Sequence, residues 1–63
     1  MLRRILRGER IEVVAGEHAG RRGVLVRKDP VAVGGRVVNH RYFVRLDDEA
    51  DEVVFSRTQL ALA

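Results

Sequence analysis

The chain has 63 residues, contains no cysteine, and carries twelve Lys or Arg residues against nine Asp or Glu, which gives a net charge of +3. This length allows one small domain, and the lack of cysteine excludes disulfide bonds and thiolate metal sites. No apolar run approaches a membrane span, and the first residues lack the apolar segment of a secretory signal, so we expect a soluble cytoplasmic protein.

The positive charge is concentrated in the first half of the chain. Residues 1–35 carry eight basic residues against four acidic ones, whereas residues 36–63 carry four against five. Eleven of the twelve basic residues are arginine, whose planar guanidinium suits phosphate and carboxylate recognition. Genome composition explains an excess of arginine equally well, so the charge alone does not identify a partner.

The sequence predicts a short basic lead-in over residues 1–8, followed by one domain over residues 9–63. Leu2, Ile5 and Leu6 stand at helix-like spacing with arginines between them, but six residues are too few for a stable isolated helix. We expect Ile5 and Leu6 to lie against the open end of the domain. The alternative is a basic arm that contacts nucleic-acid phosphates.

Two alternating apolar runs joined by a glycine-containing basic loop follow the lead-in. This pattern predicts a half-buried antiparallel hairpin, with strands at about Arg10–Ala15 and Gly23–Lys28. Ile11 and Val13 share one face of the first strand. Glycines in such a hairpin serve either turns with positive φ or the close approach of another backbone.

Asp29 and Pro30 predict a break after the second strand, because proline donates no ladder hydrogen bond and restricts the residue before it. Residues 31–35 then form a hairpin tip in which the two glycines adopt positive φ. We expect Val31 and Val33 to fold back over the end of the domain rather than to form a patch for a partner.

The longest strand is predicted at about Arg36–Leu46. Its apolar face places Tyr42, Val44 and Leu46 in the core. Strict alternation then turns Phe43 outward, between two arginines.

The remaining residues complete a small all-β fold. Residues 47–52 form an acidic, solvated turn, and residues 52–55 form a strand with Val53 and Phe55 facing inward. Residues 56–59 interrupt the apolar pattern for one turn of 3₁₀ helix, and residues 60–62 pair back as the last strand. We therefore expect a five-stranded SH3-like barrel with a 3₁₀ turn before its last strand.

The hairpin resembles a KOW motif, the signature of one branch of the SH3-like barrels. The residues that carry the resemblance are Gly8, Ile11, Val13, Gly16, Gly20, Gly23, Val24 and Val26. KOW proteins include ribosomal proteins and domains of transcription elongation factors, so the resemblance implies a role near RNA or the transcription and translation machinery. It also implies that His18, Arg21 and Arg22 lie in the region that often contacts RNA backbone. The resemblance does not cover the lysine-rich extensions of the ribosomal members or the N-terminal domain of the elongation factors, so we expect the specific role to differ from theirs.

We therefore expect a non-enzymatic module that binds RNA or other nucleic acid. The candidate contact residues are Arg3, Arg4, Arg7, His18, Arg21, Arg22, Arg27, Lys28, Arg41, Phe43 and Arg45. Their arginines attract phosphates, and the outward aromatic offers one base a stacking surface. In the alternative interpretation these arginines keep a small barrel soluble and pair with Glu9, Glu12 and Glu17. The chain would then be a protein-interaction or self-associating module that uses Phe43 and residues 31–33.

Catalysis is the third class, and the sequence favours it least. Ser56 and the two histidines show no spacing that assigns a nucleophile and a base, and the histidines have no neighbouring metal ligands, so no cofactor or metal is expected. The plasmid-borne type II dihydrofolate reductases have a similar barrel, but their pore strand reads Val-Gln-Ile-Tyr. This chain has Val-Val-Phe-Ser there, which lacks the groups that hold the ligands.

Overall fold

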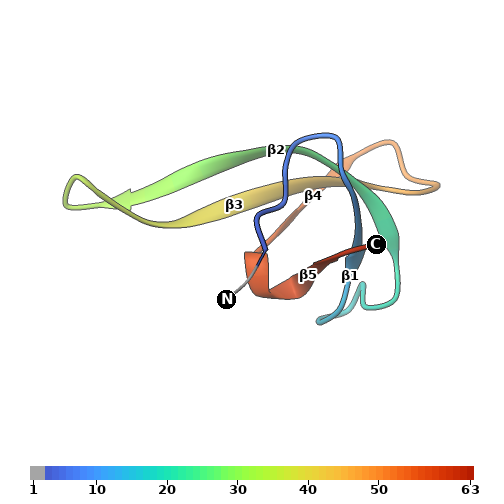
Figure 1. The fold of residues 1–63 in the computed structure, drawn as a ribbon. Coiled ribbons are helices and arrows are strands. Elements are labelled where there is room, and N and C mark those ends of the chain that lie inside the picture. Colours follow the sequence, from blue (N-terminus) through green and yellow to red (C-terminus); the bar gives the residue numbers. More distant parts are fainter. Residues whose placement is uncertain (1–2) are drawn as a thin grey trace.

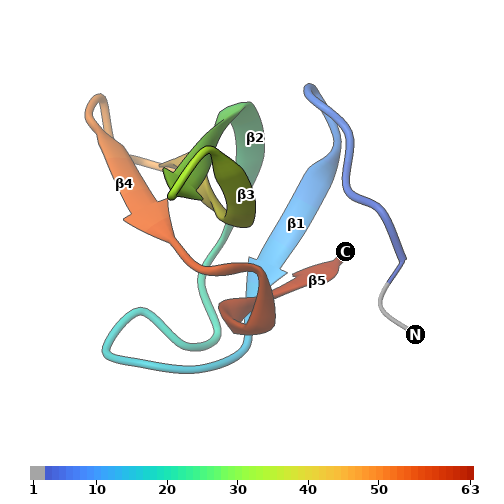
Figure 2. The ribbon, with the colours of Figure 1, turned by 90° about the vertical axis from the view of Figure 1, so that its left-hand side faces the viewer.

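The computed structural model describes residues 3–63, which form one five-stranded antiparallel sheet with strand order β4-β3-β2-β1-β5 (Figure 1). The elements are β1 (Arg10–Val13), β2 (Arg22–Val33), β3 (Arg36–Leu46), β4 (Glu52–Phe55), the 3₁₀ turn η1 (Arg57–Gln59) and β5 (Leu60–Leu62). The all-β prediction and the 3₁₀ turn are confirmed. The sheet curls (Figure 2), but no ladder joins β4 to β5 within residues 3–63, so a closed barrel is not formed by hydrogen bonding.

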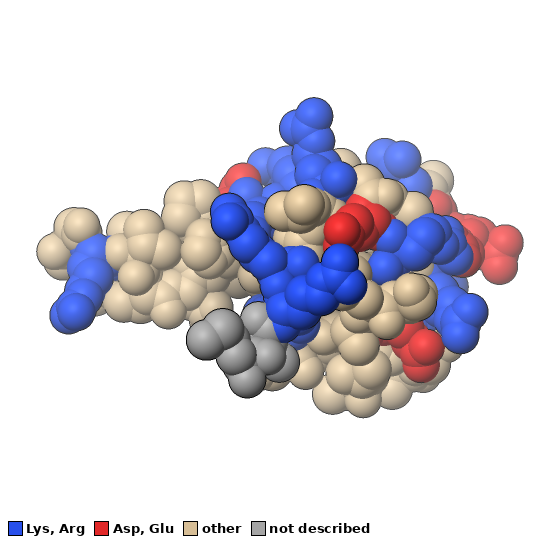
Figure 3. Space-filling model, viewed as in Figure 1, with Lys and Arg blue, Asp and Glu red and all other residues tan. Residues whose placement is uncertain are grey.

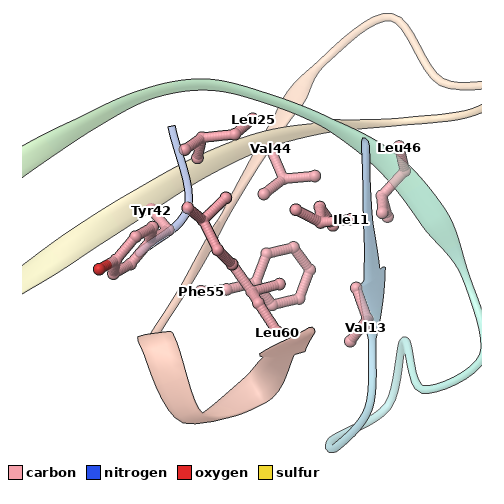
Figure 4. Packing of buried hydrophobic residues seen from close by; sticks show 9 residues of the cluster. Ile11, Val13, Leu25, Tyr42, Val44, Leu46, Phe55 and Leu60 are labelled. Atoms are coloured by element: carbon pink, nitrogen blue, oxygen red, sulfur yellow. The ribbon is translucent and has the colours of Figure 1, made fainter. Parts of the chain in front are cut away.

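The core lies inside the curl of the sheet, where side chains from every strand converge (Figure 4). The buried residues are Ile5, Ile11, Val13, Leu25, Tyr42, Val44, Leu46, Phe55 and Leu60, with Val53 and Leu62 packed against them. The predicted inward faces of β1, β3 and β4 are therefore confirmed. No helix within residues 3–63 has the length and apolar character needed to cross a membrane.

Within residues 3–8, the lead-in contributes one side chain to the core. Ile5 is fully buried, whereas Leu6 is 52% exposed, so the prediction that both pack inward is wrong for Leu6. Residues 3–6 form no helix, and the segment is held by a hydrogen bond from the Gly8 amide to the Leu25 carbonyl, 2.8 Å long. An extended chain alternates its side chains, which is why only one of two adjacent residues reaches the core. Leu2 lies outside the described residues.

β1 ends at Val13, two residues earlier than predicted, because the Val14 amide donates to the Gln59 carbonyl instead of to a neighbouring strand (2.7 Å).

β2 is longer than predicted and runs through Asp29 and Pro30, so the predicted break is wrong. The ladder between β1 and β2 stops at Val24, which leaves the later part of β2 with β3 as its only partner. Proline is tolerated on such an edge because the missing amide can face away from the ladder.

Strands β2 and β3 continue past the sheet as a two-stranded ribbon, residues 30–40, which we call the arm (Figure 1). Gly34 and Gly35 make its two-residue turn with φ of 59° and 76°, the positive values expected of a tight hairpin. The arm projects from the body, and Val33 at its tip is 65% exposed. The prediction that the tip folds back is wrong, because the ladder stays paired out to Val33 and Arg36.

Candidate nucleic-acid interface

The loop between β1 and β2 is held rigidly by backbone hydrogen bonds. The Val13 amide donates to the Arg21 carbonyl and the Gly20 amide donates to the Val13 carbonyl, at 2.8 and 2.7 Å. Both Gly16 and Gly20 have φ of 91°, which favours glycine. His18 is half-buried, and its ring meets that of Phe55 edge-on with centroids 5.8 Å apart. Packing against the core is therefore a role that the sequence did not reveal for this histidine.

Arg21 and Arg22, expected to reach a nucleic acid, already have carboxylate partners. Arg21 Nη2 lies 3.1 Å from Glu49 Oε2 and also donates to the Asp47 carbonyl. Arg22 Nε lies 3.5 Å from Glu12 Oε1 across the β1–β2 ladder. Arg21 thus pairs with Glu49 of the acidic turn, whereas Arg22 pairs with Glu12 of β1. Glu12 is one of the glutamates expected to pair in the alternative interpretation, and Glu49 is not.

Arg10, which the sequence did not single out, anchors the acidic turn. Its two terminal nitrogens donate to the two carboxylate oxygens of Asp47 at 2.9 and 2.7 Å. This bidentate hydrogen bond holds the pKa of Asp47 below its usual value of 3.8, with smaller lowering by the charges of neighbouring arginines against a raising effect of desolvation. A chain with both an acidic run and a basic loop is expected to form ion pairs between them. Which residues pair depends on how the strands are arranged in the sheet.

We expect the Arg10→Met variant to raise the pKa of Asp47 back toward 3.8, because the bidentate donor is lost. In the wild type the carboxylate is stabilised in the folded state. This contribution is present above the unfolded pKa and disappears as the pH falls through the lower folded pKa. NMR titration of the Asp47 carboxyl carbon measures both values, and equal pKa values in the two proteins would contradict the assignment.

The outward face of β3 carries a second group of candidates. Phe43 is half-buried there, and the guanidinium carbon of Arg27 lies 4.0 Å from the centre of its ring. Arg27 also binds Asp29 at 2.9 Å. Arg41 and Arg45 flank this stack on the same strand and form no ion pair with any residue of 3–63. The outward direction of Phe43 is confirmed, but Arg27 already covers one side of the ring.

The remaining candidates lie in the lead-in and at the base of the arm. Arg3, Arg4 and Arg7 are exposed and have no carboxylate partner within the described chain. Figure 3 shows Lys and Arg side chains gathered over the front of the body, where the lead-in runs, and along its upper edge. Lys28 points to the other face of the arm's base, with Nζ 6.0 Å from the ring centre of Tyr42. Arg57 holds the lead-in by donating to the carbonyls of Arg3 and Leu60.

The predicted residues therefore fall into two classes, according to whether their side chains already have partners in the fold. One class is engaged in contacts within the fold: His18, Arg21, Arg22, Arg27 and Phe43. The other has cationic groups without carboxylate partners among residues 3–63: Arg3, Arg4, Arg7, Lys28, Arg41 and Arg45. The same described residues contain no detectable pocket and no cluster of three potential metal ligands. Comparisons with protein-family models, curated proteins and solved structures find no match to this chain.

Proposed function

We propose that the chain is an SH3-like domain of the KOW type that binds the phosphate backbone of RNA or DNA. The observation that carries this proposal is the pair Arg41 and Arg45 on the outward face of β3, neither of which has an ion-pair partner in residues 3–63. Asp29 and Glu52 stand opposite these arginines in the ladders, yet Asp29 binds Arg27 instead. Guanidinium groups free of carboxylates are available for phosphate oxygens.

The lead-in extends this proposed surface. Arg3, Arg4 and Arg7 are exposed on a segment that is fixed at both ends, by Arg57 and by the Gly8 amide. A fixed segment loses less conformational entropy on binding than a free tail does, which favours affinity. The proposed site therefore combines the lead-in arginines with the outward arginines of β3 and does not depend on the loop between β1 and β2.

The chemistry of this surface favours backbone contacts over base recognition. Phe43 is the only aromatic residue on the outward face of β3, and the Arg27 guanidinium occupies one side of its ring. Phosphate contacts carry no sequence information, whereas stacking and groove contacts do. We therefore propose low sequence specificity and an affinity that falls steeply as salt rises.

A matched pair of variants tests the proposed site. We expect Arg41→Ala/Arg45→Ala to weaken the binding of a fluorescent RNA 12-mer about tenfold at low salt, and to reduce the salt slope by about 0.7 per lost contact. The control is Arg21→Ala/Arg22→Ala, which removes the same formal charge from side chains that are already paired. We expect this control to stay within about twofold of the wild type. Fluorescence anisotropy across a salt series measures both quantities.

Equal losses in the two variants would mean that only net charge matters, and would overturn the proposed site. A wild-type protein that binds neither RNA, single-stranded DNA nor duplex DNA at low salt would overturn the proposed function. Circular dichroism of each variant verifies that the fold is kept.

A further inference from the structure

The arm exposes a concentration of valine side chains that the fold does not use. Val33, Val37 and Val38 are 65%, 56% and 57% exposed. Within residues 30–40 the only Lys, Arg, Asp or Glu is Arg36, and no acidic residue occurs between Pro30 and Leu46. A single positive charge is little for a nucleic-acid contact, whereas exposed apolar side chains gain free energy when a protein surface covers them.

Each edge of the arm is blocked at one position, at the base of the arm, where Pro30 stands opposite His40. Pro30 has no amide hydrogen to offer on β2. On β3, the His40 amide donates to the side-chain oxygen of Asn39 at 2.8 Å, so this donor is already satisfied. Both features discourage edge-to-edge pairing. Side-chain contacts with the valines on the faces and tip of the arm do not need these edges.

The opposite end of the molecule carries a complementary surface. Asp48, Asp51 and Glu52 are exposed and form no ion pair within residues 3–63. Val54 follows them on β4, which is an edge strand of the sheet, and is 52% exposed. We call residues 48–54 the acidic patch. It combines negative charge with an exposed valine, and the arm combines positive charge with exposed valines, so the two surfaces have opposite charge.

The arm and the acidic patch cannot meet within one chain. The arm tip and the turn between β3 and β4 lie at opposite ends of the molecule (Figure 1), whose longest extent is 38 Å. Two copies lying side by side in opposite directions bring each arm to the acidic patch of the other copy. Both contacts then form at once around a two-fold axis, which closes the assembly at two chains.

We propose that the arm docks on the acidic patch of a second copy, giving a two-fold symmetric dimer. Arg36 and the valines of the arm are not part of the proposed phosphate surface, but the acidic patch borders it, because Glu52 stands opposite Arg45 and Val54 opposite Phe43 in the β3–β4 ladder. Association is therefore measured without nucleic acid, so that its failure is distinguishable from a failure of phosphate binding. The contact combines apolar burial with charge complementarity, so it weakens with salt less than phosphate binding does.

Sedimentation equilibrium from about 10 µM to about 1 mM, the range that suits a small interface, provides the first test. We expect the mass to rise from 7.1 kDa toward twice that value and to stop there. In Val37→Thr/Val38→Thr, which keeps the β-branched shape of both residues, we expect at least a tenfold weaker association. A wild type that stays monomeric throughout overturns the proposal, as does an unchanged association of the threonine variant.

Charge-reversal variants test whether Arg36 of one copy contacts the acidic patch of the other copy. We expect Arg36→Glu and Asp51→Lys each to weaken association when studied alone, because both contacts in each homodimer become repulsive. Mixing the two variants restores association, because the mixed dimer has one wild-type contact and one reversed contact, both attractive. A mixture that associates no better than its components overturns the pairing. A mass that grows past the dimer indicates an open head-to-tail chain and overturns the two-fold arrangement.

Discussion

Gly23→Ala is expected to leave the chain largely unfolded at 25 °C. Gly23 is buried in β2, and a Cβ atom there would overlap the backbone carbonyl of Arg45 and lie 2.9 Å from the Cα of Leu46. These are backbone atoms of the paired strand, so they cannot move aside without disturbing the β2–β3 ladder. Overpacking typically costs about 1–3 kcal/mol and occasionally more, and a clash with backbone atoms of a paired strand belongs at the upper end of this range. A core of this size rarely supplies more than about 3–5 kcal/mol in total.

Gly34→Asn is the matched control for this substitution. It also adds a Cβ atom to a glycine of the same hairpin, but no atom lies within 4 Å of the new position. The φ of 59° at Gly34 is one that asparagine tolerates well. We expect its stability to stay within about 0.5 kcal/mol of the wild type. Urea unfolding followed by circular dichroism measures both variants, and similar curves for the two would contradict the packing of Gly23 against β3.

Ile5→Ala is expected to destabilise the fold by about 2–5 kcal/mol, the usual cost of emptying a fully buried isoleucine site. Ile5 has no exposed surface and packs with residues of the sheet, although it lies outside every strand. Its loss would also loosen the middle of the lead-in between its two backbone contacts, and this segment carries three of the arginines proposed to bind phosphates. We therefore expect a lower affinity for nucleic acid together with the lower stability.

Leu6→Ala is the control for Ile5→Ala. It tests whether the loss of stability comes from the burial of Ile5 or from the loss of any apolar side chain in the lead-in. Leu6 is adjacent and also apolar, but 52% of it is exposed, so we expect a change of less than about 1 kcal/mol. Thermal unfolding of the two variants side by side provides the measurement. Equal shifts in melting temperature would show that the lead-in does not contribute a specific core residue.

The strands of this fold are predictable from the sequence wherever alternation is uninterrupted. The bounds predicted for residues 36–46, 52–55 and 60–62 agree with β3, β4 and β5. Alternation also identifies Tyr42, Val44 and Leu46 as core residues. In β2 it is less informative, because a bulge between Leu25 and Arg27 changes the register. Leu25 is consequently the buried residue of that stretch, with half-buried valines on either side.

The arm could not be predicted because its strand depends on tertiary context. Asp29 and Pro30 signal a break by their local chemistry, but a long partner strand and an open edge allow β2 to continue through them. Once β2 continues, the valines beyond Pro30 are carried away from the core instead of over it. The predicted tip and the observed arm thus share the same two-glycine turn. The prediction places this turn over the end of the domain, whereas in the structure it projects away from the body.

The sequence predicts which residue types are suited to bind phosphates. It does not predict which of these side chains remain free of ion pairs in the fold. The sequence places Arg21 and Arg22 in a basic loop, and it places five acidic residues within positions 47–52. Nothing in a linear sequence indicates that strand pairing brings Arg21 to Glu49 or Arg10 to Asp47. Long-range ion pairs therefore decide which arginines are left for a partner, and they move the proposed interface from the loop to β3 and the lead-in.

A backbone NMR titration with a short RNA at low and moderate salt tests the central proposal most directly. We expect the largest shifts at residues 3–7 and 41–45, smaller shifts at residues 16–22, and weaker shifts throughout as salt rises. Shifts centred on residues 16–22 would contradict the assignment of the interface to the unpaired arginines. The absence of any shift at low salt, with RNA or with DNA, would contradict nucleic-acid binding itself.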